Sequence, residues 1–323
     1  MFFPASTDAA ARLDEAMRED LADSLDSLGV MAAAVLPDDV DMPSALARLR
    51  TRRVAPGVFA RYYDLVFALQ RRAYPEAAAL WREIASLAEE TPGLQVIPYE
   101  TRVPGSDCER FDRLISLGAG GGRIFAPPGG DNWRSFESTA REALALLAWI
   151  EPPWWAEIQA LVAQVIAAVP PADASFRFFG LSSFMIWGAI FTNVSHQRDR
   201  VRVLAGLVHE ATHLMLFGVS RREPLLTNPP GERYASPLRR DPRPMEGVFH
   251  ATYVAGRLSR LYEILGSAQD QLTPDEAAYV RVRTDKSRER FWQGHEVVAR
   301  DAQLTPLGRR VLEEAADHVL VPA

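Results

Sequence analysis

The segment VRVLAGLVHEATHLMLFGV, residues 201–219, carries apolar residues at helical spacing and predicts a largely apolar helix over about 199–217. At its centre, His209, Glu210 and His213 form the pattern HExxH. Because residues i and i+4 lie on one face of a helix, the two imidazoles face a common point. Charged and imidazole groups are costly to bury in apolar surroundings without a partner, so we expect a functional role for them.

The two histidines predict a metal ion, because neutral imidazole is a ligand for both zinc and iron. Glu210 is rotated by about 100° from His209 around the helix. At that position Glu210 can contact a metal-bound water, but it is badly placed to be a metal ligand beside both histidines. Zinc peptidases use this spacing in that way. Glu210 is therefore the candidate catalytic residue.

A third metal ligand is expected downstream, in RRDPRPMEGVFHATYVAGRL (239–258). Glu246 and His250 lie four residues apart there and share a face if the segment is helical. A set of two histidines and one glutamate is typical of hydrolytic zinc sites. A set of three histidines also suits iron. Both residues remain candidates for the third ligand.

The remaining pattern predicts a mainly α protein with a small β-sheet (α+β), in which a zincin-like metal helix lies next to short strands after a helical N-terminal half. Strands are expected over 94–100 and within 175–194, and Ser220–Pro244 is expected to be a long polar connection with six prolines. Helices are expected over 8–28, 44–52, 57–74, 76–90, 108–118, 135–150, 155–169, 245–266, 273–300 and 306–318. The expected division is a helical region, 1–170, and a metal-binding region, 171–323, unless both form one continuous domain.

Composition narrows the setting of the protein. The chain has 323 residues, a net charge of −6 and one cysteine, Cys108, so an internal disulfide framework and a cysteine-rich metal site are both excluded. No stretch combines dense basic residues with stacking aromatics, and no apolar run approaches the roughly 20 residues that span a bilayer. The N-terminus lacks the pattern of a signal peptide. We expect a cytoplasmic protein that binds neither nucleic acid nor membrane.

Three segments together resemble a known family. They are GAIFTN (Gly188–Asn193), HEATH (His209–His213) and DPRPMEGVFH (Asp241–His250). This combination is similar to the HExxH-motif peptide-modification family, whose members accompany ribosomal peptide natural-product clusters. The resemblance covers about residues 180–260.

The resemblance implies hydroxylation, typically at the β-carbon, of a peptide side chain by an enzyme that depends on Fe(II) and 2-oxoglutarate. It implies that His209, His213 and His250 bind the metal and that the substrate is a peptide or a carrier-bound amino acid. At position 246 the family pattern has a small residue, whereas this chain has glutamate. Glu246 therefore stays an alternative ligand, and zinc stays an alternative metal.

An enzyme of this kind needs a cation for the distal carboxylate of 2-oxoglutarate, and the planar fork of arginine binds carboxylates in two places. Arg239 and Arg243 precede the expected third-ligand helix, and Arg257 lies two turns after His250. Tyr253, one turn from His250, is a candidate for orienting the cosubstrate. Asn193, which ends a strand, is a candidate for binding the substrate backbone.

Three functions therefore stand as hypotheses. The first is the iron- and 2-oxoglutarate-dependent peptide hydroxylase. The second is a zinc metallopeptidase in which Glu210 is the general base. The third is a catalytically silent module that recognises a leader peptide. A purified protein that contains no stoichiometric metal would favour this third hypothesis.

Overall fold

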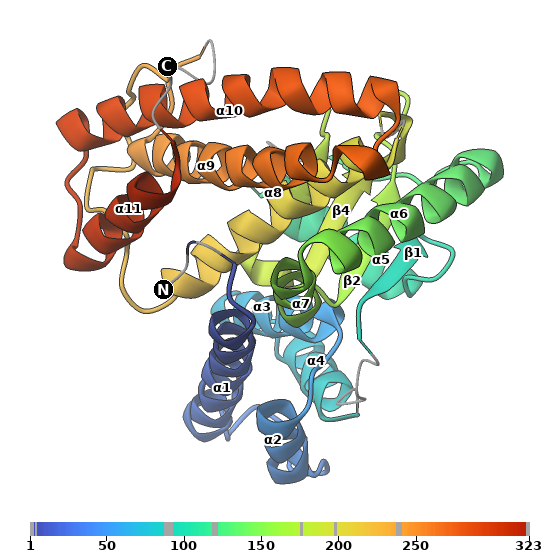
Figure 1. Ribbon diagram of the computed structural model, residues 1–323. Coiled ribbons are helices and arrows are strands. Elements are labelled where there is room, and N and C mark those ends of the chain that lie inside the picture. Colours follow the sequence, from blue (N-terminus) through green and yellow to red (C-terminus); the bar gives the residue numbers. More distant parts are fainter. Residues whose placement is uncertain are drawn as a thin grey trace. The chain divides into compact units, whose positions relative to one another are not determined.

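The computed structural model describes residues 3, 5–86, 93–117, 122–174, 177–196, 199–236 and 241–320. Within these residues, helices predominate and four strands form one small mixed sheet (Figure 1). The predicted fold class, mainly α with a small β-sheet, is confirmed.

Two compact units make up the chain. The HExxH unit consists of Met1–Ala10, Thr139–Ile158 and Asp199–Ala323, and the sheet unit consists of Ala11–Ser138 and Gln159–Arg198. Neither unit is a continuous half of the chain. The units do not coincide with a division near residue 170, because strands on both sides of that residue pair in one sheet.

The sheet has the order β1-β2-β4-β3. Strands β1 (Gln95–Pro98), β2 (Gln164–Ala168) and β4 (Ala189–Asn193) are parallel, and β3 (Gly180–Ser182) pairs antiparallel with β4 at one edge. The expected strand at 94–100 and the expected pair within 175–194 are therefore present. The sheet joins them through a strand that the sequence pattern did not predict.

That central strand corrects the predicted helix over 155–169. Helix α7 (Pro152–Leu161) ends before it, and residues 164–168 form β2, which hydrogen-bonds on both sides. A short apolar run is compatible with either a buried helix or a buried strand. Here the β-branched Val165 and Ile166 lie fully buried between two parallel neighbours, so pairing with distant segments decides the conformation.

Aromatic rings fill the core against this sheet. Phe191 on β4 stacks on Phe125 with ring centroids 4.3 Å apart, and Phe111 meets Phe191 edge to face at 5.5 Å. Ile97 and Ile166 belong to the same buried cluster. Such ring pairs add to the free energy gained from burial alone.

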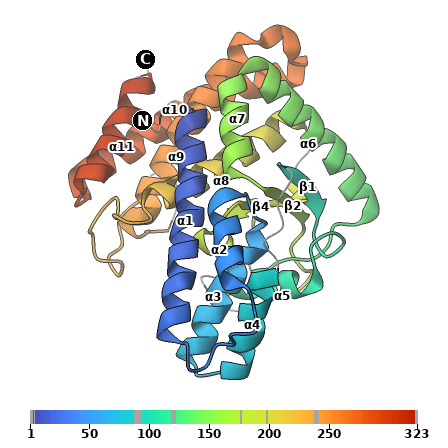
Figure 2. The same cartoon turned by 90° about the horizontal axis from the view of Figure 1, so that it is seen from below.

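Helices complete the sheet unit, and Figure 2 shows α3 alongside α4, a pair whose contact is extensive. Buried ion pairs join α3 to α5: Arg61 with Asp107 at 2.8 Å, and Arg110 with Asp64 at 2.6 Å. The helices of this unit, some of which continue into the other unit, are α1 (Thr7–Met31), α2 (Met42–Thr51), α3 (Pro56–Gln70), α4 (Tyr74–Ser86), α5 (Gly105–Ser116) and α6 (Gly130–Ile150).

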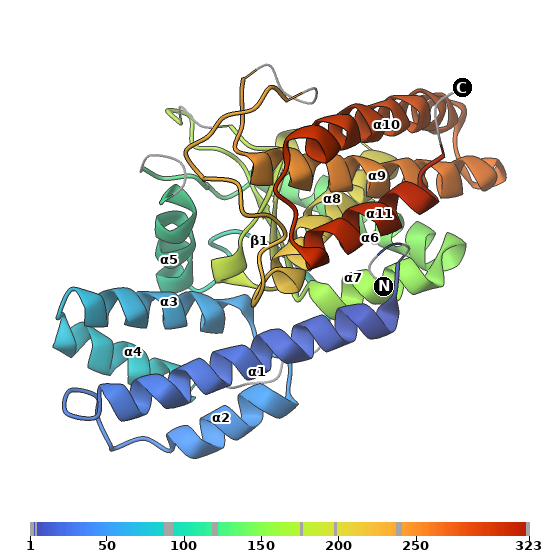
Figure 3. The same cartoon turned by 90° about the vertical axis from the view of Figure 1, so that its left-hand side faces the viewer.

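Four long helices dominate the HExxH unit: α8 (Arg200–Val219), α9 (Met245–Ser267), α10 (Pro274–Asp301) and α11 (Pro306–His318). All four were predicted to within two residues. A short turn joins α9 to α10, and the two helices run side by side with α11 against α9 (Figure 3). A capping box at Thr273 begins α10 and satisfies backbone groups of its first turn.

Glycines allow α9 and α10 to approach closely. A Cβ at Gly294 on α10 would overlap the hydroxyl of Thr252 on α9, and a Cβ at Gly256 would lie 2.9 Å from the ring of Phe291. Both positions are buried. The pair of helices therefore packs backbone against side chain, with no room for a larger residue at either position.

None of the helices in the described ranges combines the length and the apolar character that crossing a bilayer requires.

The close approach of α9 and α10 can be tested by Gly294→Ala, which we expect to lower the free energy of unfolding by about 1–3 kcal/mol through overpacking. The control is Gly266→Ala on α9, where a Cβ would meet Val280 at an ordinary 3.9 Å. Alanine there should stabilise the helix by up to about 1 kcal/mol. Urea titrations would measure both changes, and effects of the same sign at the two glycines would contradict the packing argument.

Candidate metal centre

Helix α8 presents the HExxH residues from an otherwise buried element. Its N-terminus is capped by Asp199, whose carboxylate accepts a hydrogen bond from the Arg202 backbone N–H at 2.8 Å. His209 is 43% exposed at its side chain and Glu210 only 7%. The two neighbouring side chains thus differ in environment, since that of Glu210 is buried and that of His209 is partly exposed.

Helix α9 brings His250 to the two histidines of α8. His213 lies between them: its Nε2 is 3.3 Å from Nε2 of His209, and its Nδ1 is 3.3 Å from Nδ1 of His250. The rings of His213 and His250 are close to parallel, with centroids 5.5 Å apart. The three imidazoles predicted as metal ligands therefore form one contiguous cluster.

The spacing of the α8 pair fits two ligands of one metal ion. With metal–nitrogen bonds of about 2.0–2.1 Å, adjacent ligand nitrogens lie about 2.8 to 3.0 Å apart in an octahedral site and about 3.3 to 3.4 Å apart in a tetrahedral one. His250, however, faces the opposite nitrogen of His213. Among the described residues, no three His, Cys, Asp or Glu side chains converge as a ready ligand set. A third ligand from α9 would need a side-chain rotation.

Burial keeps two of these imidazoles neutral. Burial, together with charge on His209 and His250, holds the pKa of His213 well below its ordinary value of 6.5. Burial likewise lowers the pKa of His250 to about 4. Neutral imidazole is the form that binds metals, so near neutral pH the cluster offers free nitrogen lone pairs without first releasing protons.

Phe217, which was not predicted as a site residue, packs against the cluster. It lies one turn after His213, with its ring centroid 6.3 Å from that of His213 and 5.5 Å from that of His250. Its spacing of four residues from His213 was a usable signal, because side chains at i and i+4 meet on a helix. Its contact with α9 could come only from the fold.

The two glutamates of the predicted site differ in their surroundings. Glu210 is buried, with Oε1 3.9 Å from Nε2 of His209. Glu246 is exposed in the first turn of α9, one turn before His250. Either can reach the histidine face of its own helix, but only Glu246 is open to solvent.

The predicted cosubstrate arginines are not gathered in one place. Arg243 is 42% exposed at its side chain and pairs with Asp241 at 2.8 Å, and its backbone forms a bridge with Tyr234. Arg257 is fully buried and forms an ion pair with Glu157, while its guanidinium covers the ring of Trp154. Arg239 lies outside the described residues.

Tyr253 and Asn193 both lie in packed interiors. Tyr253 is fully buried and meets Phe3 edge to face, with ring centroids 5.7 Å apart. Asn193 in the sheet unit is also fully buried. Its amide donates to the Phe178 carbonyl at 2.8 Å and accepts from the Ser195 backbone N–H at 3.0 Å. Asn193, predicted from the sequence to contact substrate, therefore holds the end of β4 through these hydrogen bonds.

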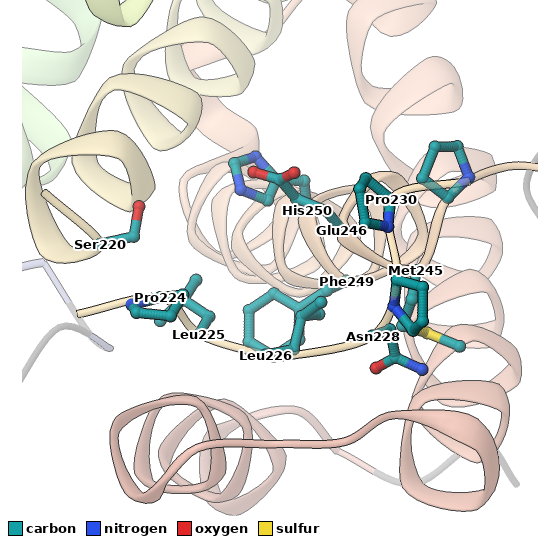
Figure 4. A pocket seen from close by; sticks show the side chains of 12 residues that line it. Ser220, Pro224, Leu225, Leu226, Asn228, Pro230, Met245, Glu246, Phe249 and His250 are labelled. Carbon is teal, nitrogen blue, oxygen red and sulfur yellow. The ribbon is translucent and has the colours of Figure 1, made fainter. Parts of the chain in front are cut away.

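A cavity of about 280 Å³ lies beside His250 (Figure 4). The described residues that line it come from the start of α9 and from the segment before it: Ser220, Pro224, Leu225, Leu226, Asn228, Pro229, Pro230, Pro244, Met245, Glu246, Phe249 and His250. The segment expected to be only a polar connection thus supplies an apolar wall. Its signal was the pair of leucines, 225 and 226, between prolines.

No known protein family matches the chain, and the search of curated proteins finds no significant similarity.

The buried histidines predict acid sensitivity of the metal-free protein. The unfolded chain binds a proton at His250 below pH 6.5, whereas the folded chain does so only near pH 4. Stability should therefore be fully present above about pH 6.5 and decline as pH falls toward 4, by up to about 3 kcal/mol for this residue. Urea titrations from pH 4 to 7 on wild type and His250→Gln would measure it. If the free energy of unfolding depends on pH in the same way in both proteins, His250 is not the group that causes the acid sensitivity.

The Arg257–Glu157 pair predicts a stability effect. Glu157→Ala leaves a buried guanidinium without its carboxylate and should cost about 3–5 kcal/mol. The double variant Arg257→Met/Glu157→Met should recover most of this loss, because both charges are then removed. Thermal unfolding of the single and double variants gives the comparison. If Glu157→Ala leaves the free energy of unfolding nearly unchanged, the structure does not require this ion pair.

Proposed function

We propose that this protein is an Fe(II)- and 2-oxoglutarate-dependent oxygenase that hydroxylates a residue, at its β-carbon, in a peptide or carrier-bound substrate of natural-product biosynthesis. The observation that carries the proposal is the contiguous cluster of His209, His213 and His250. The resemblance of the DPRPMEGVFH segment to peptide hydroxylases supports the same assignment.

In this proposal His209 and His213 bind the metal through Nε2, as their 3.3 Å separation favours. His250, which would need a side-chain rotation because it faces Nδ1 of His213, would be the third ligand. Iron bound there would supply the oxygen-activating chemistry. Three neutral ligands leave the ion its full positive charge, which favours an anionic keto acid at the remaining positions.

Arg243 is our candidate for the distal carboxylate of 2-oxoglutarate. It directly precedes α9, its guanidinium reaches solvent, and its present partner is the exposed carboxylate of Asp241. A dicarboxylate could replace such a partner at little cost, because exposed ion pairs contribute little stability. Arg257 is a weaker candidate, since its charge is already matched by buried Glu157.

A zinc metallopeptidase is the second candidate. Glu210 lies beside His209, where a general base for hydrolysis would act, and exposed Glu246 offers a carboxylate ligand one turn from His250. In that alternative Glu210→Gln removes nearly all hydrolysis.

We further propose that the protein works in the cytoplasm, where a lone buried thiol such as Cys108 stays reduced. Its partner would be a peptide substrate, and neither nucleic acid nor membrane is needed for the reaction.

The test is anaerobic reconstitution of metal-free protein with Fe(II) followed by 2-oxoglutarate. We expect one iron per chain and a visible charge-transfer band, both lost in His209→Ala, His213→Ala and His250→Ala. They should be kept in Glu246→Ala and in His318→Ala, a control at an exposed histidine. Succinate should form when substrate is oxidised.

The opposite pattern would assign the peptidase ligand set. If Glu246→Ala loses the metal while His250→Ala retains it, and zinc binds at one per chain without any band, the oxygenase proposal is wrong. A protein that binds neither metal would favour the leader-binding module.

A further inference from the structure

The apolar wall of the cavity beside His250 is hydrogen-bonded to a second segment of the chain. Backbone N–H groups of Thr227 and Thr305 donate to the carbonyls of Gln303 and Leu225 at 2.9 and 3.1 Å, which ties the proline-rich segment to the α10–α11 connection. Gly308 lets the Leu225 carbonyl approach so closely that a Cβ there would overlap it. Hydrogen bonds and close packing therefore hold this wall in place.

Two of the polar lining residues are already bonded within the protein. The Asn228 amide donates to Tyr234 at 2.8 Å and to the Asp301 carbonyl at 3.0 Å, and it accepts from the Gln303 N–H at 2.7 Å. The Ser220 hydroxyl donates to the Leu216 carbonyl at 2.8 Å. Polar contacts with a ligand are therefore left mainly to Glu246 and His250.

These two residues form the polar end of the cavity. In Figure 4 the Glu246 carboxylate and the His250 ring project the same way from α9, above the apolar side chains of Leu226 and Phe249. The described lining includes a carboxylate but no lysine or arginine. A dicarboxylate such as 2-oxoglutarate does not fit here, because the carboxylate would repel it and no lining cation would bind it.

From this arrangement we propose that the cavity binds one uncharged apolar side chain of the substrate peptide, of leucine to phenylalanine size, with a basic residue beside it in the sequence against Glu246. The volume of 280 Å³ is at the lower limit of ligand pockets, so it has room for one such side chain and part of the residue beside it. That the bound peptide is a substrate, with its reacting atom next to the histidines, rests on the proposed function. The binding of an apolar side chain in the cavity does not depend on it.

Met245 provides a direct probe, because it lines the cavity and is one of seven methionines. Full-length, metal-free protein labelled with ¹³C at the methionine methyl groups would be titrated with acetyl-Leu-Lys-amide, acetyl-Ala-Lys-amide and acetyl-Leu-Glu-amide. Comparison with a Met245→Leu spectrum assigns the signal. We expect a saturable shift with the Leu-Lys probe.

The Ala-Lys probe should bind at least ten-fold more weakly, because each buried methylene contributes to affinity. The Leu-Glu probe should bind a few-fold more weakly at low salt, and the difference should shrink at high salt because Glu246 is exposed. Glu246→Gln should remove the Lys/Glu preference and keep the Leu/Ala preference.

Leu226→Trp should fill the cavity and abolish the shift, whereas Val282→Trp, at a 65% exposed position on α10, should leave it unchanged. Leu226→Ala tests the same cavity with less risk to folding and should shift preference from leucine toward phenylalanine. Equal binding of Leu and Ala probes, or no effect of either Leu226 variant, would overturn the proposal.

Failure of this proposal can be told apart from failure of the oxygenase proposal. If the Met245 signal shifts with the probe but the iron-loaded protein never oxidises a peptide, the proposal for the cavity stands and the oxygenase proposal is wrong. If the Leu226 variants oxidise peptides as the wild type does, the oxygenase proposal stands and the proposal for the cavity is wrong.

Discussion

The contact between α9 and α10 is the one on which the candidate site depends. Gly294 and Gly256 bring the two helices together at positions where a larger residue has no room, and Thr252 fills the space over Gly294. His250 is two residues from Thr252, which places it about 200° around the helix from that contact. The α10 side of α9 thus holds the helix in place, while the other side carries the imidazole to α8.

The environment of the histidines follows from that packing. A buried imidazole is stable only when neutral, because the protein interior penalises an unpaired charge. Both His213, which contacts two other imidazoles and Phe217, and His250 meet this condition. Packing that was needed to join two helices therefore also prepares nitrogen lone pairs, which is the property that a metal centre needs.

One helix serves both the cluster and the cavity. Glu246, Phe249 and His250 lie within about one turn of α9, and they supply the cavity's charge, its apolar floor and its contact with the histidines. The opposite wall comes from the proline-rich segment, held by the α10–α11 connection. In the proposed function, the choice of substrate and the chemistry would be coupled through this short stretch of α9.

The sequence alone determined the long helices and the residues that could bind a metal. Helices α8 to α11 were predictable within two residues because their apolar periodicity is long and their ends carry capping residues such as Asp199 and Thr273. The HExxH spacing placed two imidazoles on one face by helix geometry, which requires no tertiary contact.

Only the tertiary structure decided the rest, because it depends on residues far apart in the chain. Residues 164–168 form a strand since two parallel neighbours pair with them, although their apolar run alone was compatible with a helix. Arg257 lies seven residues from His250 on its helix, yet its charge is taken by Glu157, a hundred residues earlier. Leu225 and Leu226 line a cavity because backbone hydrogen bonds fasten them to residues 303–305. The local pattern of apolar residues does not predict such distant partners.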